Sequence, residues 1–160
     1  MFQTHIDIEE VSQFINECSP ETKIYIGVDS ERFRLNGVWN IDYISVVIVH
    51  FDGKHGCKIF GAVERERDWG TAANKPKMRL MGEVYRAADL YLALSKMVAH
   101  DIEVHLDLSP QPQHGSNVAV QEAVGYIKGM CQVTPRVKPE AFAASYAADQ
   151  YKSFDSRRVA

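Results

Sequence analysis

Four acidic residues stand where the sequence predicts that strands or helices begin or end. Asp29 follows the apolar, β-favouring stretch KIYIGV, and Asp107 closes a second apolar stretch in EVHLDL. Glu83 lies early in a long helical pattern, and Asp149 lies in an alanine-rich one near the C-terminus. Burying a carboxylate is costly unless a cation or a hydrogen-bond donor compensates its charge. These positions therefore raise the question of what the four carboxylates bind.

Gathered carboxylates favour one kind of chemistry. They repel one another and raise each other's pKa values, a penalty that divalent cations remove. Several hard oxygen ligands suit Mg²⁺ or Mn²⁺, which keep bound waters and bind phosphate oxygens. Two such ions about 4 Å apart, bridged by Asp29, would activate a water and stabilise the leaving oxygen in phosphodiester cleavage. The acids thus predict a two-metal nuclease, provided that the fold brings them together.

Each acid also has a purely structural interpretation when it is taken alone. A strand-end aspartate such as Asp29 or Asp107 is often a turn or cap residue. Glu83 has arginines three and four residues away, which is typical of a solvated helix surface. Asp149 lies on the helix face that should pack on the protein, and it could pair with Lys152. The joint pattern, more than any single acid, supports the metal site.

The order of the elements favours a common location for the acids. The apolar spacing predicts helices over 7–17, 78–98, 117–130 and 139–151, and strands over 24–28, 37–51, 57–66, 102–108 and 131–139. This α-βββ-α-β-α-β-α order predicts an α/β fold with one mixed five-stranded sheet and helices on both faces. The strands that end at Asp29 and Asp107 would be parallel neighbours, and open α/β sheets bind ligands at that carboxyl edge.

The overall composition predicts a single domain over residues 1–160, with a leading helix within 1–20 and a frayed tail over 152–160. Apolar residues make up 46% of the chain and charged residues 24%, the balance of a soluble globular protein. Neither a membrane-spanning stretch nor a signal peptide pattern is present, so we expect a cytoplasmic protein without a membrane partner. The three cysteines are far apart and indicate neither a disulfide framework nor a zinc ribbon.

Four stretches of the sequence resemble a known family. They are YIGVDSERF, RLMGEV, VHLDLSPQPQHGSN and VKPEAFAASYAADQYK. They are similar to the YkuK-like family of predicted RNase-H-like nucleases, and the order of elements resembles the ribonuclease H superfold. The resemblance covers roughly residues 5–152. It implies that the metal-binding and catalytic acids are Asp29, Glu83, Asp107 and Asp149, with two Mg²⁺ or Mn²⁺ ions as cofactors.

Further candidates would bind the substrate or move a proton. Arg136 and Lys138 lead into the last predicted helix, where their charges would contact nucleic-acid phosphates and not bases. The family pattern implies that Lys138 lines the same edge as Ser116 and Asn117, and Ser30 lies within the IGVDS motif. The following list gives the substrate-binding candidates: Ser30, Ser116, Asn117, Arg136 and Lys138.

Two histidines and two tryptophans leave alternatives open. His105 shares the strand of Asp107, and His114 lies in the loop after it. Either histidine could transfer a proton near the metals, or it could be a packed or solvent-exposed residue without a role in the reaction. Trp39 and Trp69 fit either the core or a stacking surface, and the sequence alone does not separate these.

Three function classes compete. The first is a nuclease that cleaves RNA, an RNA–DNA hybrid or structured DNA and leaves a 3′-hydroxyl. The second is a non-catalytic module that binds nucleic acid or protein on the same fold. The third is an actin-like nucleotide-binding ATPase, which is disfavoured because GVDSERF has bulky side chains where a phosphate loop needs glycines.

Overall fold

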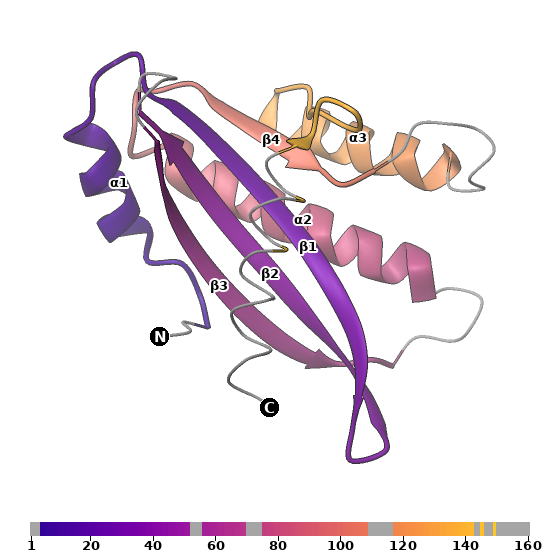
Figure 1. The fold of residues 1–160 in the computed structure, drawn as a ribbon. Helices are drawn as coiled ribbons and strands as arrows, with labels where there is room; N and C mark the ends of the chain where they lie inside the picture. The colour runs from indigo at the N-terminus through magenta and orange to yellow at the C-terminus, as the bar shows by residue number, and fades with distance from the viewer. Residues whose placement is uncertain are drawn as a thin grey trace.

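A four-stranded mixed sheet forms the centre of the computed structural model, which describes residues 4–51, 56–69, 75–108 and 117–142 together with 145 and 149. The elements are α1 (Ile8–Asn16), β1 (Lys23–Leu35), β2 (Val38–His50), β3 (Cys57–Arg67), α2 (Lys75–Ser95), β4 (Ile102–Leu106) and α3 (Asn117–Cys131). The strand order is β3-β2-β1-β4, with β1 antiparallel to β2 and parallel to β4 (Figure 1). The mixed α/β architecture is the one that the sequence predicts.

The first three strands form the predicted antiparallel meander. Asn36 and Gly37 have positive φ angles of 52° and 78°, the backbone that a two-residue hairpin turn between β1 and β2 requires. The paired strands then run in register from Leu35 opposite Val38 to Lys23 opposite His50. Valine and isoleucine are frequent in β2 because branched side chains pack well on a pleated surface.

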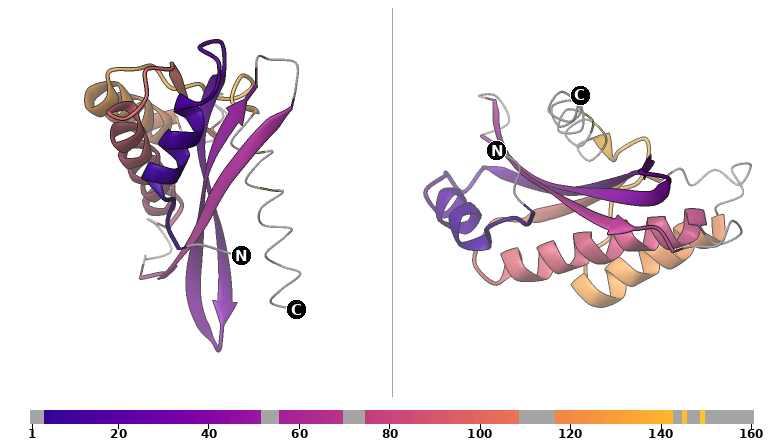
Figure 2. Two further views of the ribbon diagram at one scale, coloured as in Figure 1. Left: turned by 90° about the vertical axis from the view of Figure 1, so that its left-hand side faces the viewer. Right: turned by 90° about the horizontal axis from the view of Figure 1, so that it is seen from below.

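The three described helices all lie on one face of the sheet (Figure 2). Ile24, Ile26 and Val28 of β1 belong to the core that these helices cover, as strand alternation requires. The other face carries a smaller apolar cluster that includes Tyr25, and the ring of Phe142 contacts Tyr25 at 5.8 Å between centroids. Helices were expected on both faces; of the expected last helix, over 139–151, the structure describes only part.

The predicted fifth strand, over 131–139, is not confirmed. It is reduced to an isolated parallel bridge between His105 and Arg136. Pro135 has no N–H to donate, and Gln132 has a positive φ of 59°, so a regular ladder cannot extend along this segment. The bridge nevertheless holds residue 136 beside β4, because Arg136 donates to Val104 at 2.8 Å and Leu106 donates to Arg136 at 2.9 Å.

Strand β1 is longer than the sequence analysis predicted. The prediction ended it before Asp29, because the residues that follow are polar, whereas the strand continues to Leu35. Antiparallel pairing with β2 satisfies its backbone, and polar side chains are tolerated there because the strand is only partly buried. The tail over 152–160 lies outside the described residues. None of the described helices has the length and apolarity that crossing a bilayer would need.

Candidate functional site

The register of β1 and β4 places two of the predicted acids side by side. The last residue pair of the parallel ladder is Val28 opposite Leu106. Asp29 and Asp107 are the residues that follow this pair, so they occupy equivalent positions just beyond the end of β4. Because side chains alternate along a strand, both carboxylates lie on the face opposite Val28 and Leu106. Asp149 is exposed and not on a packed face as predicted, but its charge acts on Lys138 beside Asp107. We call this place, with Glu83 and Asp149, the acid edge.

Helix α2 brings Glu83 to the acid edge through a close contact with the sheet. A Cβ built on Gly82 would lie 2.6 Å from Cζ of Tyr43, so only glycine allows the helix to approach β2 this closely. The hydroxyl of Ser30 then donates to Oε1 of Glu83 at 2.9 Å. The backbone N–H of Ser30 donates to Oδ1 of Asp29 at 2.8 Å. Ser30 therefore links the acid of the helix to the acid of the strand.

The electrostatic environment of Glu83 is the clearest sign that the acids converge. Burial away from water raises the pKa of the Glu83 carboxyl from 4.5 to about 8, and the charges of Asp29 and Asp107 add to this increase. The Ser30 hydrogen bond and the charge of Arg79 lower the pKa but do not offset these effects. Without a bound cation, Glu83 therefore retains its proton at neutral pH.

Lys138 lies among the other acids. Its Nζ is 2.9 Å from Oδ1 of Asp107, and the hydroxyl of Ser145 donates to the same oxygen at 2.9 Å. The hydrogen bond to Asp107 raises the pKa of the Lys138 ammonium, and the charges of Asp29 and Asp149 raise it further. The backbone N–H of Lys138 donates to Leu108 at 2.8 Å, which fixes the lysine at the end of β4. The peptide bond from Lys138 to Pro139 is cis.

The acid edge offers the type of ligand atom, carboxylate oxygen, that hard divalent cations prefer. Its candidate ligands are carboxylate oxygens, and a cation would relieve the charge that raises the pKa of Glu83. Within the described part of the chain, however, no three histidine, cysteine, aspartate or glutamate side chains are grouped closely enough to hold a metal ion. Ligation of one ion by several of these carboxylates would therefore require them to move closer together.

Other predicted site residues lie elsewhere or outside the described part. Arg136 pairs with Glu103 at 3.1 Å and lines a separate cavity of about 750 Å³, formed with the α2–β4 turn and the start of β4. His105 is 1% exposed, its ring lies 5.0 Å from that of Tyr25, and burial lowers its pKa, so it is neutral and packed in the core. His114 and Ser116 are not among the described residues, nor is the side chain of Asn117.

Two residues that position the acids, Ser145 and Gly82, were not among the predicted site residues. Ser145 lies four residues before Asp149, so both would lie on one face of a helix, and that spacing was an available signal. Gly82 directly precedes Glu83, but a glycine within a helical pattern does not reveal that a tyrosine ring will lie against it. Such a close approach becomes visible only when the strand partner is known.

The chain resembles known proteins at the level of a family. The family model described as Ribonuclease H-like matches residues 7–153. No curated protein matches the chain. A solved structure titled "Crystal structure of NurA" resembles this one with a TM-score of 0.32 and 14% sequence identity, over 78% of this chain. The aligned part covers 35% of that protein, so this chain corresponds to about a third of its length.

Proposed function

Because the chain belongs to the ribonuclease H-like family, we propose that it is a divalent-metal-dependent nuclease that hydrolyses phosphodiester bonds of RNA, an RNA–DNA hybrid or structured DNA. The observation that carries the proposal is the electrostatic coupling of four acids from four separate segments. Glu83 is influenced by Asp29 and Asp107, and Lys138 is influenced by Asp29, Asp107 and Asp149. Acids whose pKa values are raised by one another are frequent at functional sites, and bound cations would offset their charge.

In the proposed mechanism Asp29, Glu83, Asp107 and Asp149 would hold two Mg²⁺ or Mn²⁺ ions. When bound, such ions would lower the pKa of a water and stabilise the charge on the leaving oxygen. Glu83 would give up its proton to serve as a ligand, because a nearby cation offsets the charge of the neighbouring carboxylates. The backbone and hydroxyl of Ser30 keep the carboxyls of Asp29 and Glu83 in one orientation.

Lys138 and Ser145 complete the proposed roles. The side chain of Lys138 is 53% exposed, so its ammonium can leave Asp107 for a phosphate of the substrate without crossing the core. Ser145 continues to donate to Asp107, which keeps that carboxylate directed toward the acid edge. The lysine thus neutralises the acids before the cations and the substrate bind, and contacts the phosphate afterwards.

The substitution Asp107→Asn tests the reaction. It keeps the size of the side chain but removes the charge, so cleavage of labelled RNA, hybrid and branched DNA substrates should fall at least about a hundredfold. Asp89→Asn is the matched control, because Asp89 is an exposed acid on α2 away from the acid edge. Circular dichroism melting checks that both variants fold. Cleavage by Asp107→Asn at the wild-type rate would contradict the assignment.

One observation favours the second candidate, a binding module without catalysis. The ion pair of Lys138 with Asp107 gives the acid edge a cation of its own, and no three described acids are in a ligating arrangement. A module of this kind would bind nucleic acid equally well with and without Mg²⁺ and cleave none of the substrates. Activity that depends on Mg²⁺ or Mn²⁺ and disappears in a chelator would exclude it.

A further inference from the structure

Strands β1, β2 and β3 continue past the acid edge as an arm, which we define as residues 30–43 and 64–69. The pairing of β1 with β4 ends at Val28, whereas its pairing with β2 continues to Leu35. Strand β3 accompanies β2 as far as Arg67, opposite Asn40. The hairpin end of the arm projects beyond the helices (Figure 1). Apart from Ser30, no residue of the arm has a role in the proposed cleavage reaction.

The arm carries both tryptophans of the chain, and each has an arginine over its ring. Trp39 is 36% exposed and has the guanidinium of Arg32 at 3.7 Å and that of Arg34 at 5.5 Å from its ring centre. Trp69 is 75% exposed, with the guanidinium of Arg67 at 4.0 Å. Asp68 pairs with Trp39 across the strands, so Trp39 lies on one face of the arm, and Arg67 and Trp69 lie on the other. Tryptophan is highly buried on average, so the largely exposed indole of Trp69 indicates a binding surface on its face.

The arginines of the arm divide into two groups. Arg32 is paired with Asp68 at 2.5 Å, and Arg65 is held by both oxygens of Asp42 at 2.8 and 3.0 Å. These two guanidinium groups stabilise the arm itself. Arg34 donates to the carbonyl of Gly37 at 3.3 Å.

Arg34 and Arg67 form the second group. Neither has a carboxylate partner among the residues that the structure describes. Two arginines next to exposed indoles, without an acid to neutralise them, are suited to a ligand that combines negative charge with flat rings. Nucleotides have both properties.

The arm and the acid edge lie along the same strand. Arg67 of β3 lies opposite Asn40, and Asn40 lies opposite Phe33 of β1, which is four residues from Asp29 and on the same face of the sheet. Four residues correspond to about 13 Å at the usual rise of a strand. A single nucleic-acid strand could therefore lie across the arm while one of its phosphodiesters reaches the acids.

We propose that the arm binds unpaired nucleotides of the substrate strand on the face that carries Asp29, with a base stacked on Trp69 and a phosphate contacted by Arg67. The inference takes its ligand class from the proposed nuclease function, which it deepens. An indole can stack only on a base whose own face is open, so single strands are favoured over a continuous duplex. The pre-positioned guanidinium group of Arg67 orients the indole before the nucleotide arrives.

Tryptophan fluorescence tests the arm directly. The chain has two tryptophans, so Trp39→Phe leaves Trp69 as the sole reporter. A single-stranded oligonucleotide added in the presence of a chelator should quench this emission, and a blunt duplex of the same sequence should not. Oligonucleotide binding, followed by anisotropy of a labelled strand, should weaken about five- to a hundredfold in Trp69→Ala. Tyr85→Ala is the control, because Tyr85 is an exposed aromatic residue outside the arm.

The salt dependence of binding tests the arginines. In Arg67→Gln the slope of log affinity against log salt should decrease by about 0.7, the loss of one phosphate contact to a single strand. Lys58→Gln is the matched control, because Lys58 lies 5.4 Å from the Phe60 ring at the other end of β3. Its slope should equal that of the wild type.

Three results would overturn the proposal. Trp69→Ala could bind the single strand as tightly as the wild type, or the duplex could bind more tightly than the single strand. Alternatively, the wild type could form a dimer that Trp69→Ala dissolves, without binding any oligonucleotide, which would assign the arm to a second copy. Because binding is measured without metal, a protein that binds the single strand but cleaves nothing would reject the nuclease function and keep the binding role of the arm. A protein that cleaves normally, and whose arm variants bind as tightly as the wild type, would reject the binding role of the arm alone.

Discussion

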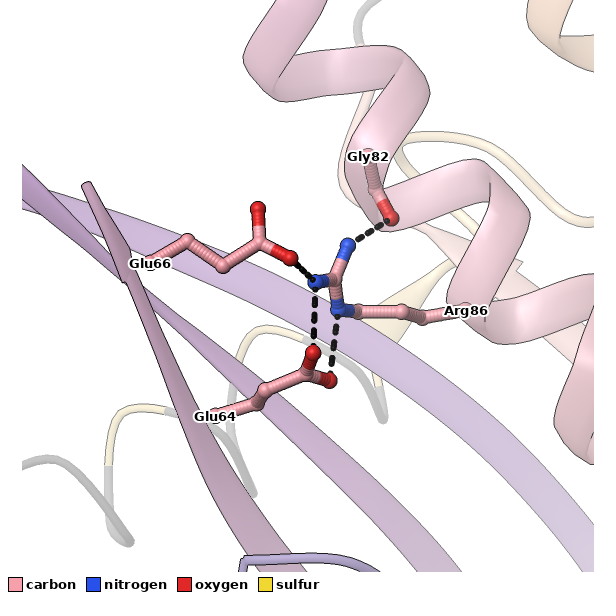
Figure 3. A network of polar contacts seen from close by, with 4 residues as sticks. All are labelled: Glu64, Glu66, Gly82 and Arg86. Carbon is pink, nitrogen blue, oxygen red and sulfur yellow. Dashed lines mark hydrogen bonds and ion pairs between the residues drawn. The ribbon is translucent and has the colours of Figure 1, made fainter. Parts of the chain in front are cut away.

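Two of the regions in which acidic side chains meet cations differ in how the acidic charge is compensated. In the first region Arg86 binds Glu64 through two hydrogen bonds of 3.1 Å and Glu66 through one of 2.6 Å (Figure 3). It also donates to the carbonyl of Gly82 at 3.1 Å and lies 3.7 Å from the ring of Tyr43. This Arg86 network joins α2 to the outer strands and is complete within the protein.

The acid edge is compensated less fully. Lys138 and two serine hydroxyls contact its carboxylates, yet the pKa of Glu83 is raised to about 8 by burial and by the charge of Asp29. The protein therefore holds this cluster in a state that a proton or a further cation would stabilise. The acids of the Arg86 network thus have their own arginine, whereas the proposed metal ligands leave room for an external cation.

Neutralising one acid in each region should affect activity very differently. Glu83→Gln should reduce metal-dependent cleavage at least about a hundredfold, because it removes a proposed ligand while keeping the hydrogen bond to Ser30 available. Glu66→Gln changes one half-exposed acid of the Arg86 network and should leave the cleavage rate within about twofold, since an exposed ion pair contributes little. Initial rates with Mg²⁺ check both. Equal losses in the two variants would remove the distinction between the regions.

The stability of the metal-free protein should depend on pH through Glu83. Its pKa is raised in the folded state from 4.5 to about 8, so the folded protein binds the proton more tightly than the unfolded chain. This contribution is fully present below pH 4.5 and is lost as the pH rises toward 8. The melting temperature of the wild type in a chelator should therefore decrease over that range relative to Glu83→Gln. If the melting temperatures of the two proteins changed with pH in the same way, the pKa of Glu83 would not be raised by burial and by its neighbours.

A smaller effect, on the free energy of unfolding, is expected for Gly82, which contacts Arg86 and directly precedes Glu83. Gly82→Ala should destabilise the fold by about 1–3 kcal/mol, because the added methyl group would meet the ring of Tyr43. Gly125→Ala on α3 is the control: a Cβ there has no neighbour within 4 Å, and alanine should stabilise the helix by up to about 1 kcal/mol. Urea unfolding measures both. A neutral Gly82→Ala would mean that α2 can move away from the sheet without cost.

The adjacency of Asp29 and Asp107 could be predicted because it depends on topology. Once β1 and β4 are parallel neighbours, the residues that follow the last pair of the ladder must lie side by side. The length of β1 could not be predicted in the same way, since the alternating polar residues after Asp29 resemble a strand end when the partner strand is unknown. Their backbone is satisfied by β2, from a distant part of the chain.

The segment around Arg136 shows the opposite error. The residues VTPRV favour a strand by composition, but Pro135 and the positive φ of Gln132 limit pairing with β4 to one bridge. Arg136 pairs with Glu103 because of this geometry. Its guanidinium therefore does not lie beside Asp107, where a phosphate contact was predicted. Side-chain partners across the bridge are a tertiary property that local sequence does not encode.

Divalent-cation binding to the folded protein tests the central claim most directly. At about a hundredfold excess over Kd, Mg²⁺ or Mn²⁺ should raise the melting temperature of the wild type by about 5–10 °C. Asp29→Asn should lose this increase, and Glu66→Gln should retain it. A wild-type melting temperature that does not change at millimolar Mg²⁺ or Mn²⁺ would contradict the account, because the acid edge would then need no external cation.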